Sequence, residues 1–160
     1  EKVLTSIRPF VKYINSSKYI EDLANGEICL ALGWSGDVLQ ARDRAAEAGN
    51  DVVVKYLIPR EGAVMFFDML AIPADAKHVK NAHLFIDYLL RPDVAAKNTN
   101  FVNFANSNAA SFSQVNEEIR NDPGIEPAEA IKPKLVPDLA ESSAFTRLLT
   151  RSWTRFKTGQ

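Results

Sequence analysis

The 160-residue sequence has little of what metal sites, disulfides, membrane spans and nucleic-acid surfaces are made from. One cysteine and two histidines exclude a disulfide within the chain and give little support to a histidine metal site or a Ser-His-Asp triad. A net charge of −1 argues against a nucleic-acid partner or an anionic membrane, since both require a basic face. No apolar run approaches the length that crosses a bilayer. No phosphate loop, dinucleotide fingerprint or paired-cysteine motif occurs, so we expect neither a cofactor nor a metal.

The single cysteine, Cys29, lies within the apolar run Ile28-Cys29-Leu30-Ala31. We expect a small buried hydrophobic residue there and not a catalytic thiol, because no histidine or cationic group lies near it in the sequence. The chain begins Glu1-Lys2, with neither an initiator methionine nor a signal peptide. This start predicts that a segment was removed or that the sequence belongs to a longer protein.

Apolar residues make up 46% of the chain and charged residues 24%, as in ordinary globular proteins. Their spacing predicts strands that alternate with helices at first and helices that dominate later, which indicates an α/β fold. Strands are expected over residues 10–14, 27–33, 51–58 and 63–72. Helices are expected over residues 1–8, 18–24, 37–48, 76–90, 94–100, 113–121, 127–131 and 142–157.

The most informative stretch, Gly33-Trp34-Ser35-Gly36-Asp37, directly follows the predicted strand over 27–33. It places an indole, a hydroxyl and a carboxylate at the carboxyl end of that strand, the edge where open α/β sheets bind ligands. A carboxylate beside an aromatic face holds an organic ammonium by charge and by cation–π attraction. The alternative is that Asp37 only caps the following helix and that Trp34 fills the core.

A second carboxylate, Asp68, interrupts the otherwise apolar run from Val64 to Ile72. Burying an unpaired carboxylate costs several kcal/mol, so Asp68 should face water, a partner cation or a ligand. Phe66 lies two residues earlier, on the same face of a strand, and makes a second aromatic–carboxylate pair. Two such pairs favour an organic cation as ligand. The alternative is an exposed strand residue or an ion pair with a nearby arginine.

Several further segments carry a family resemblance. They are Ser6-Ile7-Arg8-Pro9-Phe10, Tyr19-Ile20-Glu21-Asp22-Leu23-Ala24-Asn25-Gly26-Glu27-Ile28-Cys29, Glu61-Gly62-Ala63, Ile119-Arg120-Asn121-Asp122-Pro123-Gly124 and Thr150-Arg151-Ser152-Trp153-Thr154. Together with the stretches around Trp34 and Asp68, they strongly resemble bacterial periplasmic putrescine/spermidine-binding proteins. The resemblance implies a periplasmic binding protein type II-like fold, with two hinge-linked lobes that close around a polyamine. It also implies that ABC permease subunits in the membrane are the partner.

The resemblance covers only the C-terminal half of such proteins. The chain is therefore expected to be an incomplete C-terminal portion, with a complementary N-terminal segment as a further partner. Residues 1–50 would form part of the C-terminal lobe, and residues 51–100 would contribute to the other lobe through hinge crossings. Residues 101–160 would return to the first lobe as helices.

The resemblance also implies which residues touch the ligand. Trp34 would stack on the methylene chain and Asp37 would pair with one ammonium. Asp68 would take an ammonium at the other end, with Phe66 as a wall of the pocket. A diamine requires a carboxylate near each end, because desolvating two ammoniums is costly unless each meets an anionic partner.

Two further positions match the family's contacts in part. Ser16 resembles a polar contact at the end of a strand. Phe104 lies where many relatives have a tyrosine, and phenylalanine has no hydroxyl to offer. The leading interpretation is a non-enzymatic periplasmic receptor. The alternatives are a hydrolase or transferase that uses Asp37 and Asp68 as paired carboxylates, and a structural fragment that binds no polyamine.

Overall fold

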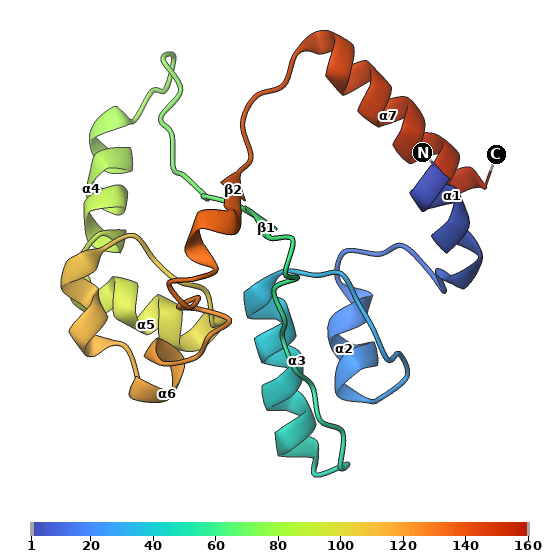
Figure 1. Cartoon of the computed structure of the whole chain (residues 1–160). Coiled ribbons are helices and arrows are strands. Elements are labelled where there is room, and N and C mark those ends of the chain that lie inside the picture. Colours follow the sequence, from blue (N-terminus) through green and yellow to red (C-terminus); the bar gives the residue numbers. More distant parts are fainter. Residues whose placement is uncertain (1, 160) are drawn as a thin grey trace. The chain divides into compact units, whose positions relative to one another are not determined.

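The computed structural model describes residues 2–159, which fall into two compact units (Figure 1). The smaller unit combines the stretch up to Ser17 with the stretch from Asp138 onward, and the larger unit covers Lys18–Pro137. The expected division into 1–50, 51–100 and 101–160 concerns the lobes of a complete two-lobed protein, and it stays a prediction.

The larger unit begins with two helices that pack against each other, α2 (Lys18–Ala24) and α3 (Ser35–Ala48) (Figure 1). The helix predicted over 18–24 is confirmed, and the one predicted over 37–48 begins two residues earlier. Gly26, with φ +72°, follows the end of α2, and Gly49, with φ +60°, ends α3. Both lie in the left-handed region that a residue without a Cβ adopts easily.

The segments 27–33 and 51–58 are extended but belong to no sheet in the described part of the chain. Burial alternates along the second one, where Val52, Val54 and Tyr56 pack on the α2–α3 core. The predicted strands at 27–33 and 51–58 are therefore wrong as sheet strands, although the side chains of 51–58 follow the period of two. Alternation fixes which side chains face inward, whereas ladder hydrogen bonds also require an extended neighbour in register.

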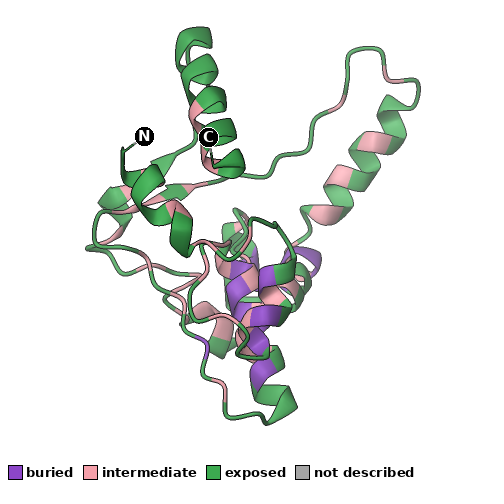
Figure 2. Ribbon diagram, turned by 90° about the vertical axis from the view of Figure 1, so that its right-hand side faces the viewer, coloured by how far each residue is buried: buried purple, intermediate pink, exposed green. Residues whose placement is uncertain are grey.

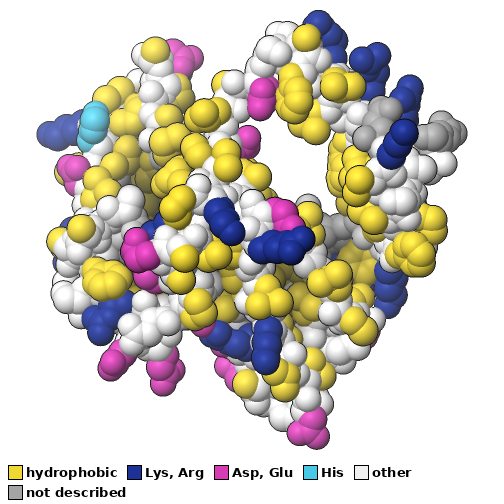
Figure 3. Space-filling model, in the orientation of Figure 1, with side chains coloured by type: hydrophobic (Ala, Val, Ile, Leu, Met, Phe, Trp, Pro, Cys, Tyr) yellow, Lys and Arg dark blue, Asp and Glu magenta, His cyan; other side chains and the backbone are white. Residues whose placement is uncertain are grey.

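Several large apolar side chains of these two segments are open to solvent. Leu30 is 90% exposed and Leu32 is 100% exposed, while Val53 and Leu57 are each 79% exposed. Cys29 is exposed as well, so the expectation that it is buried is wrong. Figure 3 shows hydrophobic side chains spread widely over the face that it draws.

The sheet found within residues 2–159 consists of β1 (Ala63–Met65) and β2 (Leu135–Pro137), which run parallel with Ala63 opposite Leu135. A parallel pair requires a long crossover, and here the connection contains several helices. This arrangement confirms the α/β fold class. The strand predicted over 63–72 ends at Met65, and residues 10–14 form no strand, since Phe10 ends a short 3-10 helix.

The crossover contains α4 (Val79–Leu89), α5 (Pro92–Val102), the 3-10 helix η2 (Ala109–Gln114), α6 (Glu117–Arg120) and the 3-10 helix η3 (Lys132–Lys134). Pro92 begins α5, and Asn103 ends it with φ +58°. The helices predicted over 76–90 and 94–100 are confirmed within a few residues. The helix predicted over 113–121 is split between η2 and α6, and residues 127–131 form no helix.

The buried residues of the larger unit gather on α3 and α5 (Figure 2). One apolar cluster joins α2 and α3 through Tyr19, Ala24, Val38, Ala41 and Ala45. Polar contacts tie α3 to later segments. Arg42 forms an ion pair with Asp122, and the Asn103 side chain donates to Asp43 Oδ2 at 2.9 Å.

The smaller unit consists of α1 (Lys2–Ile7), the 3-10 helix η1 (Arg8–Phe10) and α7 (Ser143–Thr158). The predicted terminal helices are confirmed within a residue or two. Arg8 donates to the backbone carbonyls of Phe156 and Lys157 at 2.7 and 3.3 Å, and so satisfies carbonyls at the end of α7. Between residues 2 and 159, no helix is both long enough and apolar enough to cross a membrane.

Candidate functional site

The predicted ligand-binding motif forms the start of α3. Trp34 is the N-cap residue, with extended backbone, and Asp37 lies in the first turn of the 14-residue helix. The positive end of a helix dipole favours a carboxylate at this place. The Trp34 side chain is 47% exposed, so the alternative that it fills the core is wrong. The motif therefore presents an indole and a carboxylate from one helix terminus.

A single tyrosine hydroxyl joins the two halves of this motif. Tyr19 of α2 donates its hydroxyl proton to Oδ2 of Asp37 at 2.6 Å. The Tyr19 hydroxyl oxygen in turn accepts the backbone N–H of Trp34 at 3.1 Å. Tyr19 is only 4% exposed, and burial, with the hydrogen bond to Asp37, raises its pKa to about 12. The hydroxyl therefore keeps its proton at neutral pH and remains a donor to Asp37.

Two aromatic rings explain why positions 33 and 36 of the motif are glycine. A Cβ at Gly33 would lie 2.9 Å from the Tyr19 hydroxyl oxygen and closer still to its ring. A Cβ at Gly36 would lie 2.7 Å from Cγ of Phe104 and would overlap other atoms of that ring. Gly33 and Gly36 thus allow Tyr19 and Phe104 to pack directly against the backbone on which Trp34 and Asp37 are placed.

Replacing Gly36 with alanine is expected to destabilise the protein by about 1–2 kcal/mol, because the added methyl must displace the Phe104 ring. Alanine is otherwise the better helix former by about 1 kcal/mol, so a net loss reports the clash. Urea denaturation measures the effect. In a Phe104→Ala background the ring is gone, and the same substitution should be neutral or stabilising. An equal loss in both backgrounds would contradict the contact.

The structure brings two of the predicted aromatic and carboxylate positions into direct contact. The rings of Trp34 and Phe66 meet edge to face, with centroids 4.6 Å apart and planes at 82°. Phe66 directly follows β1, so this contact links the end of β1 to the start of α3. Edge-to-face pairs of this kind are a preferred aromatic geometry. Together the two half-exposed rings form an apolar surface, and Trp34 lies three residues before Asp37 in the chain.

Asp68 and Ser16 are two further residues of the predicted ligand site, and both are exposed. Asp68 is exposed, two residues beyond Phe66, and within residues 2–159 it has no hydrogen-bond or ion-pair partner. It faces solvent, as an unpaired carboxylate must. Ser16 is exposed and belongs to the smaller unit. The assignment of Ser16, Trp34, Asp37, Phe66, Asp68 and Phe104 to a ligand site stays a prediction.

Tyr19 is the residue of this site that the sequence interpretation missed. The sequence indicates Tyr19 only as a member of the helix predicted over 18–24 and of the segments that carry the family resemblance. Its partners lie 15 and 18 positions further along the chain, too far for a helical or strand periodicity to indicate the contact. The signal that could have found it is glycine at position 33, since a residue without a Cβ often marks a close approach.

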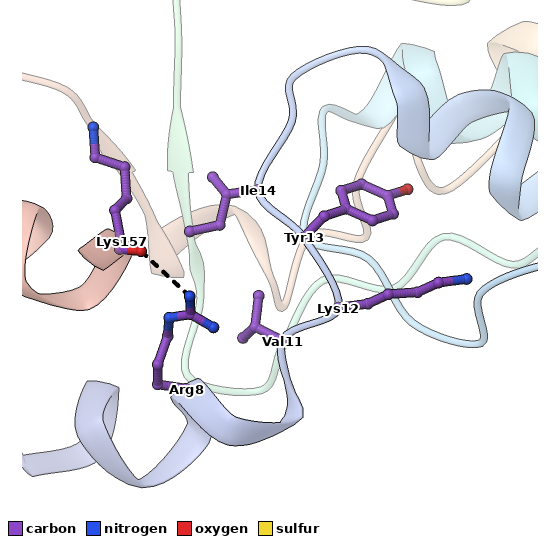
Figure 4. Close-up of a pocket in the computed structure, with 6 residues that line it drawn as sticks. All are labelled: Arg8, Val11, Lys12, Tyr13, Ile14 and Lys157. Atoms are coloured by element: carbon purple, nitrogen blue, oxygen red, sulfur yellow. Dashed lines mark hydrogen bonds between the residues drawn. The ribbon is translucent and has the colours of Figure 1, made fainter. Parts of the chain in front are cut away.

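Another pocket, of about 300 Å³, lies in the smaller unit (Figure 4). Arg8, Lys12 and Lys157 line it together with Val11, Tyr13 and Ile14. Three cationic side chains make it unsuitable for a dication. In the described part of the chain, no group of three or more His, Cys, Asp or Glu side chains could hold a metal ion.

Comparison with known proteins gives consistent matches. Residues 1–127 match the model of the bacterial extracellular solute-binding protein family. The chain is 52% identical to the putrescine-binding periplasmic protein SpuD of Pseudomonas aeruginosa over 162 aligned positions, which cover 100% of this chain and 44% of SpuD. It is 48% identical to the putrescine-binding periplasmic protein PotF of Escherichia coli, covering 99% of this chain and 43% of PotF. A spermidine/putrescine-binding periplasmic protein of Escherichia coli is 35% identical over 81% of this chain and 36% of its own length. The chain thus spans less than half the length of these relatives.

Proposed function

Because the chain belongs to the bacterial extracellular solute-binding protein family, we propose that the protein is a periplasmic receptor for a polyamine, putrescine or spermidine. It captures the polyamine and delivers it to the permease subunits of an ABC importer. The observation that carries the proposal is the start of α3. There Tyr19 holds the carboxylate of Asp37 in the first turn, and the half-exposed ring of the N-cap residue Trp34 packs on Phe66. The names of the relatives with 52% and 48% identity support putrescine as the first ligand to test.

The chemistry of a diamine fits the residues at hand. One ammonium pairs with Asp37, where charge-assisted hydrogen bonds are strongest. The methylene chain lies against the apolar rings of Trp34 and Phe66, and the indole face also attracts the cation. Asp68, two residues beyond Phe66, receives the second ammonium. Ser16 and Phe104 contribute further contacts in the complete site.

The complete site requires a complementary segment outside this chain. The segments 27–33 and 51–58 are extended, lack strand partners within the described residues, and expose Leu30, Leu32, Val53 and Leu57. A strand with apolar side chains on both faces is typical of a sheet that is covered on both sides. The relatives are more than twice as long as the part that aligns here. The corresponding residues of the whole protein would cover these faces and complete the two-lobed receptor.

The receptor binds its ligand without chemical change. Asp37 accepts a hydrogen bond from the Tyr19 hydroxyl, and the Trp34 ring, three residues earlier in the chain, packs on Phe66. A carboxylate combined with aromatic rings suits a bound organic cation, whereas a paired-carboxylate hydrolase would use its carboxylates as acid and base or as nucleophile. The relatives carry the names of binding proteins, which supports the same conclusion.

The test is calorimetric titration of putrescine and spermidine into the full gene product and, separately, into the 160-residue chain. We expect the full product to bind putrescine at a single site and to release it unchanged. Butanediol and n-butylamine are the matched ligands: the first has no ammonium and the second has one, so both should bind far more weakly. Absence of polyamine binding by the full product, or turnover of putrescine, would overturn the receptor function. Tight putrescine binding by the 160-residue chain alone would overturn only the proposal that the site requires a complementary segment.

A further inference from the structure

We infer that Tyr19 is the positioning residue of the polyamine site: one buried hydroxyl fixes both the carboxylate of Asp37 and the backbone of Trp34. This inference rests on the proposed function and deepens it. It assigns to α2 a role in binding although no atom of Tyr19 is required to touch the ligand.

The hydrogen bonds define the direction in which the carboxylate points. A phenol has one donor and two acceptor positions. In Tyr19 the donor is used on Oδ2 of Asp37 at 2.6 Å, and one acceptor position receives the Trp34 N–H at 3.1 Å. Among the described residues, the structure shows no partner for Oδ1 of Asp37. Asp37 is thus held by one oxygen and offers the other to a cation.

The ring of Tyr19 is fixed independently of its hydroxyl. Tyr19 belongs to the buried cluster with Ala24, Val38 and Ala41, and its ring lies against the backbone of Gly33. A phenylalanine at position 19 would fill the same space and make the same apolar contacts. The hydroxyl can therefore be removed alone, without a cavity and without loss of the ring that explains Gly33.

The physical consequence is preorganisation. A carboxylate on a free side chain must be immobilised when it pairs with an ammonium, and each immobilised side chain lowers affinity. With Tyr19 holding Asp37, that ordering is already complete in the unliganded protein. The hydrogen bond from the Trp34 N–H to the same hydroxyl holds the backbone from which the indole side chain extends. Burial and the hydrogen bond to Asp37 raise the Tyr19 pKa to about 12, so the phenol remains a donor throughout the neutral and mildly alkaline range.

The test is Tyr19→Phe in the full gene product, with putrescine affinity measured by calorimetry. We expect a loss of about 3- to 10-fold, the effect of freeing one or two ordered groups. The matched control is Tyr56→Phe, because Tyr56 is another tyrosine packed on the same cluster and has no hydrogen bond to the motif among the described residues. Tyr56→Phe should leave affinity unchanged. Urea denaturation of both variants separates an effect on binding from an effect on folding.

A double-mutant cycle distinguishes positioning from a general structural role. If Tyr19 acts largely through the Asp37 carboxylate, Tyr19→Phe should have a clearly smaller effect in an Asp37→Asn background, where only the hydrogen bonds to the substituted side chain and to the Trp34 amide are left to lose, but its full effect in an Asp68→Asn background. The amide resonance of Trp34 should also shift in Tyr19→Phe. Two results would refute the positioning role and leave the proposed function intact. The first is an equal loss of putrescine affinity from Tyr19→Phe in both backgrounds. The second is unchanged putrescine affinity in Tyr19→Phe although Asp37→Asn binds putrescine weakly. Failure of the unaltered protein to bind any polyamine would instead refute the proposed function.

Discussion

Replacing Asp37 with asparagine in the full gene product is expected to weaken putrescine binding by about 2–5 kcal/mol, the usual cost of removing one partner from a desolvated charge pair. This corresponds to about 30-fold to several-thousand-fold in Kd. Asparagine keeps the shape of the side chain, and its amide oxygen can still accept the Tyr19 hydroxyl. The substitution therefore removes the charge and leaves the local hydrogen bond in place.

The measurement is a calorimetric titration beside two further variants. Asp68→Asn is expected to weaken diamine binding comparably and to leave n-butylamine binding less affected, because a monoamine needs only one carboxylate. Asp87→Asn is the matched control, since Asp87 is an exposed carboxylate on α4. Near-unaltered putrescine affinity in both Asp37→Asn and Asp68→Asn would show that the site lies elsewhere.

Replacing Gly62 with alanine is expected to cost about 3–4 kcal/mol of folding stability, because two effects add. Gly62 has φ +113°, which L-residues rarely adopt. A Cβ there would also overlap the backbone carbonyl oxygen of Lys134, next to the start of β2. Gly62 closes the turn that leads into β1, where its N–H donates to the Pro59 carbonyl at 2.9 Å. The clash therefore falls on the parallel pairing itself.

Gly49→Ala is the matched control for this prediction. Gly49 also has positive φ, +60°, but a Cβ there would meet nothing within 4 Å. Its replacement should cost about 1 kcal/mol, the price of the left-handed conformation alone. Urea midpoints for the two variants, at unchanged slope, give the comparison. If Gly62→Ala is no more destabilising than Gly49→Ala, the close approach of Lys134 is not a constraint on the fold.

The helices could be predicted because their signals are local. The helix over 18–24 has apolar positions at helical spacing and a glycine just past its end, and α2 has these bounds. The strands could be predicted only as extended segments. Whether residues 51–58 join a ladder depends on which other segment lies beside them, and nothing in Val52–Ile58 encodes that neighbour. In β2 the pairing partner lies far away in the sequence, and a short proline-rich stretch gave no strand signal.

The candidate site was predictable to a similar extent. A carboxylate and an indole at the start of a helix could be expected from the sequence pattern, and the structure adds that the rings of Trp34 and Phe66 meet. The support of Asp37 by Tyr19 was not predictable, since hydrogen bonds between separate elements follow from packing. For the same reason the sequence did not reveal that Phe104 packs on Gly36.

The parallel pairing of Ala63 with Leu135 has a consequence for the order of folding. The α2–α3 cluster forms between segments that are close in the sequence, so little chain entropy is lost when it forms. The β1–β2 pair can form only after the whole crossover has been gathered, so its contacts carry a high sequence separation and slow the search. Phe66 follows β1 directly, so the pairing of β1 with β2 holds the segment that places its ring against Trp34. We therefore expect the Trp34–Phe66 pair to become fixed late in folding, so that the tryptophan ring reports the native topology.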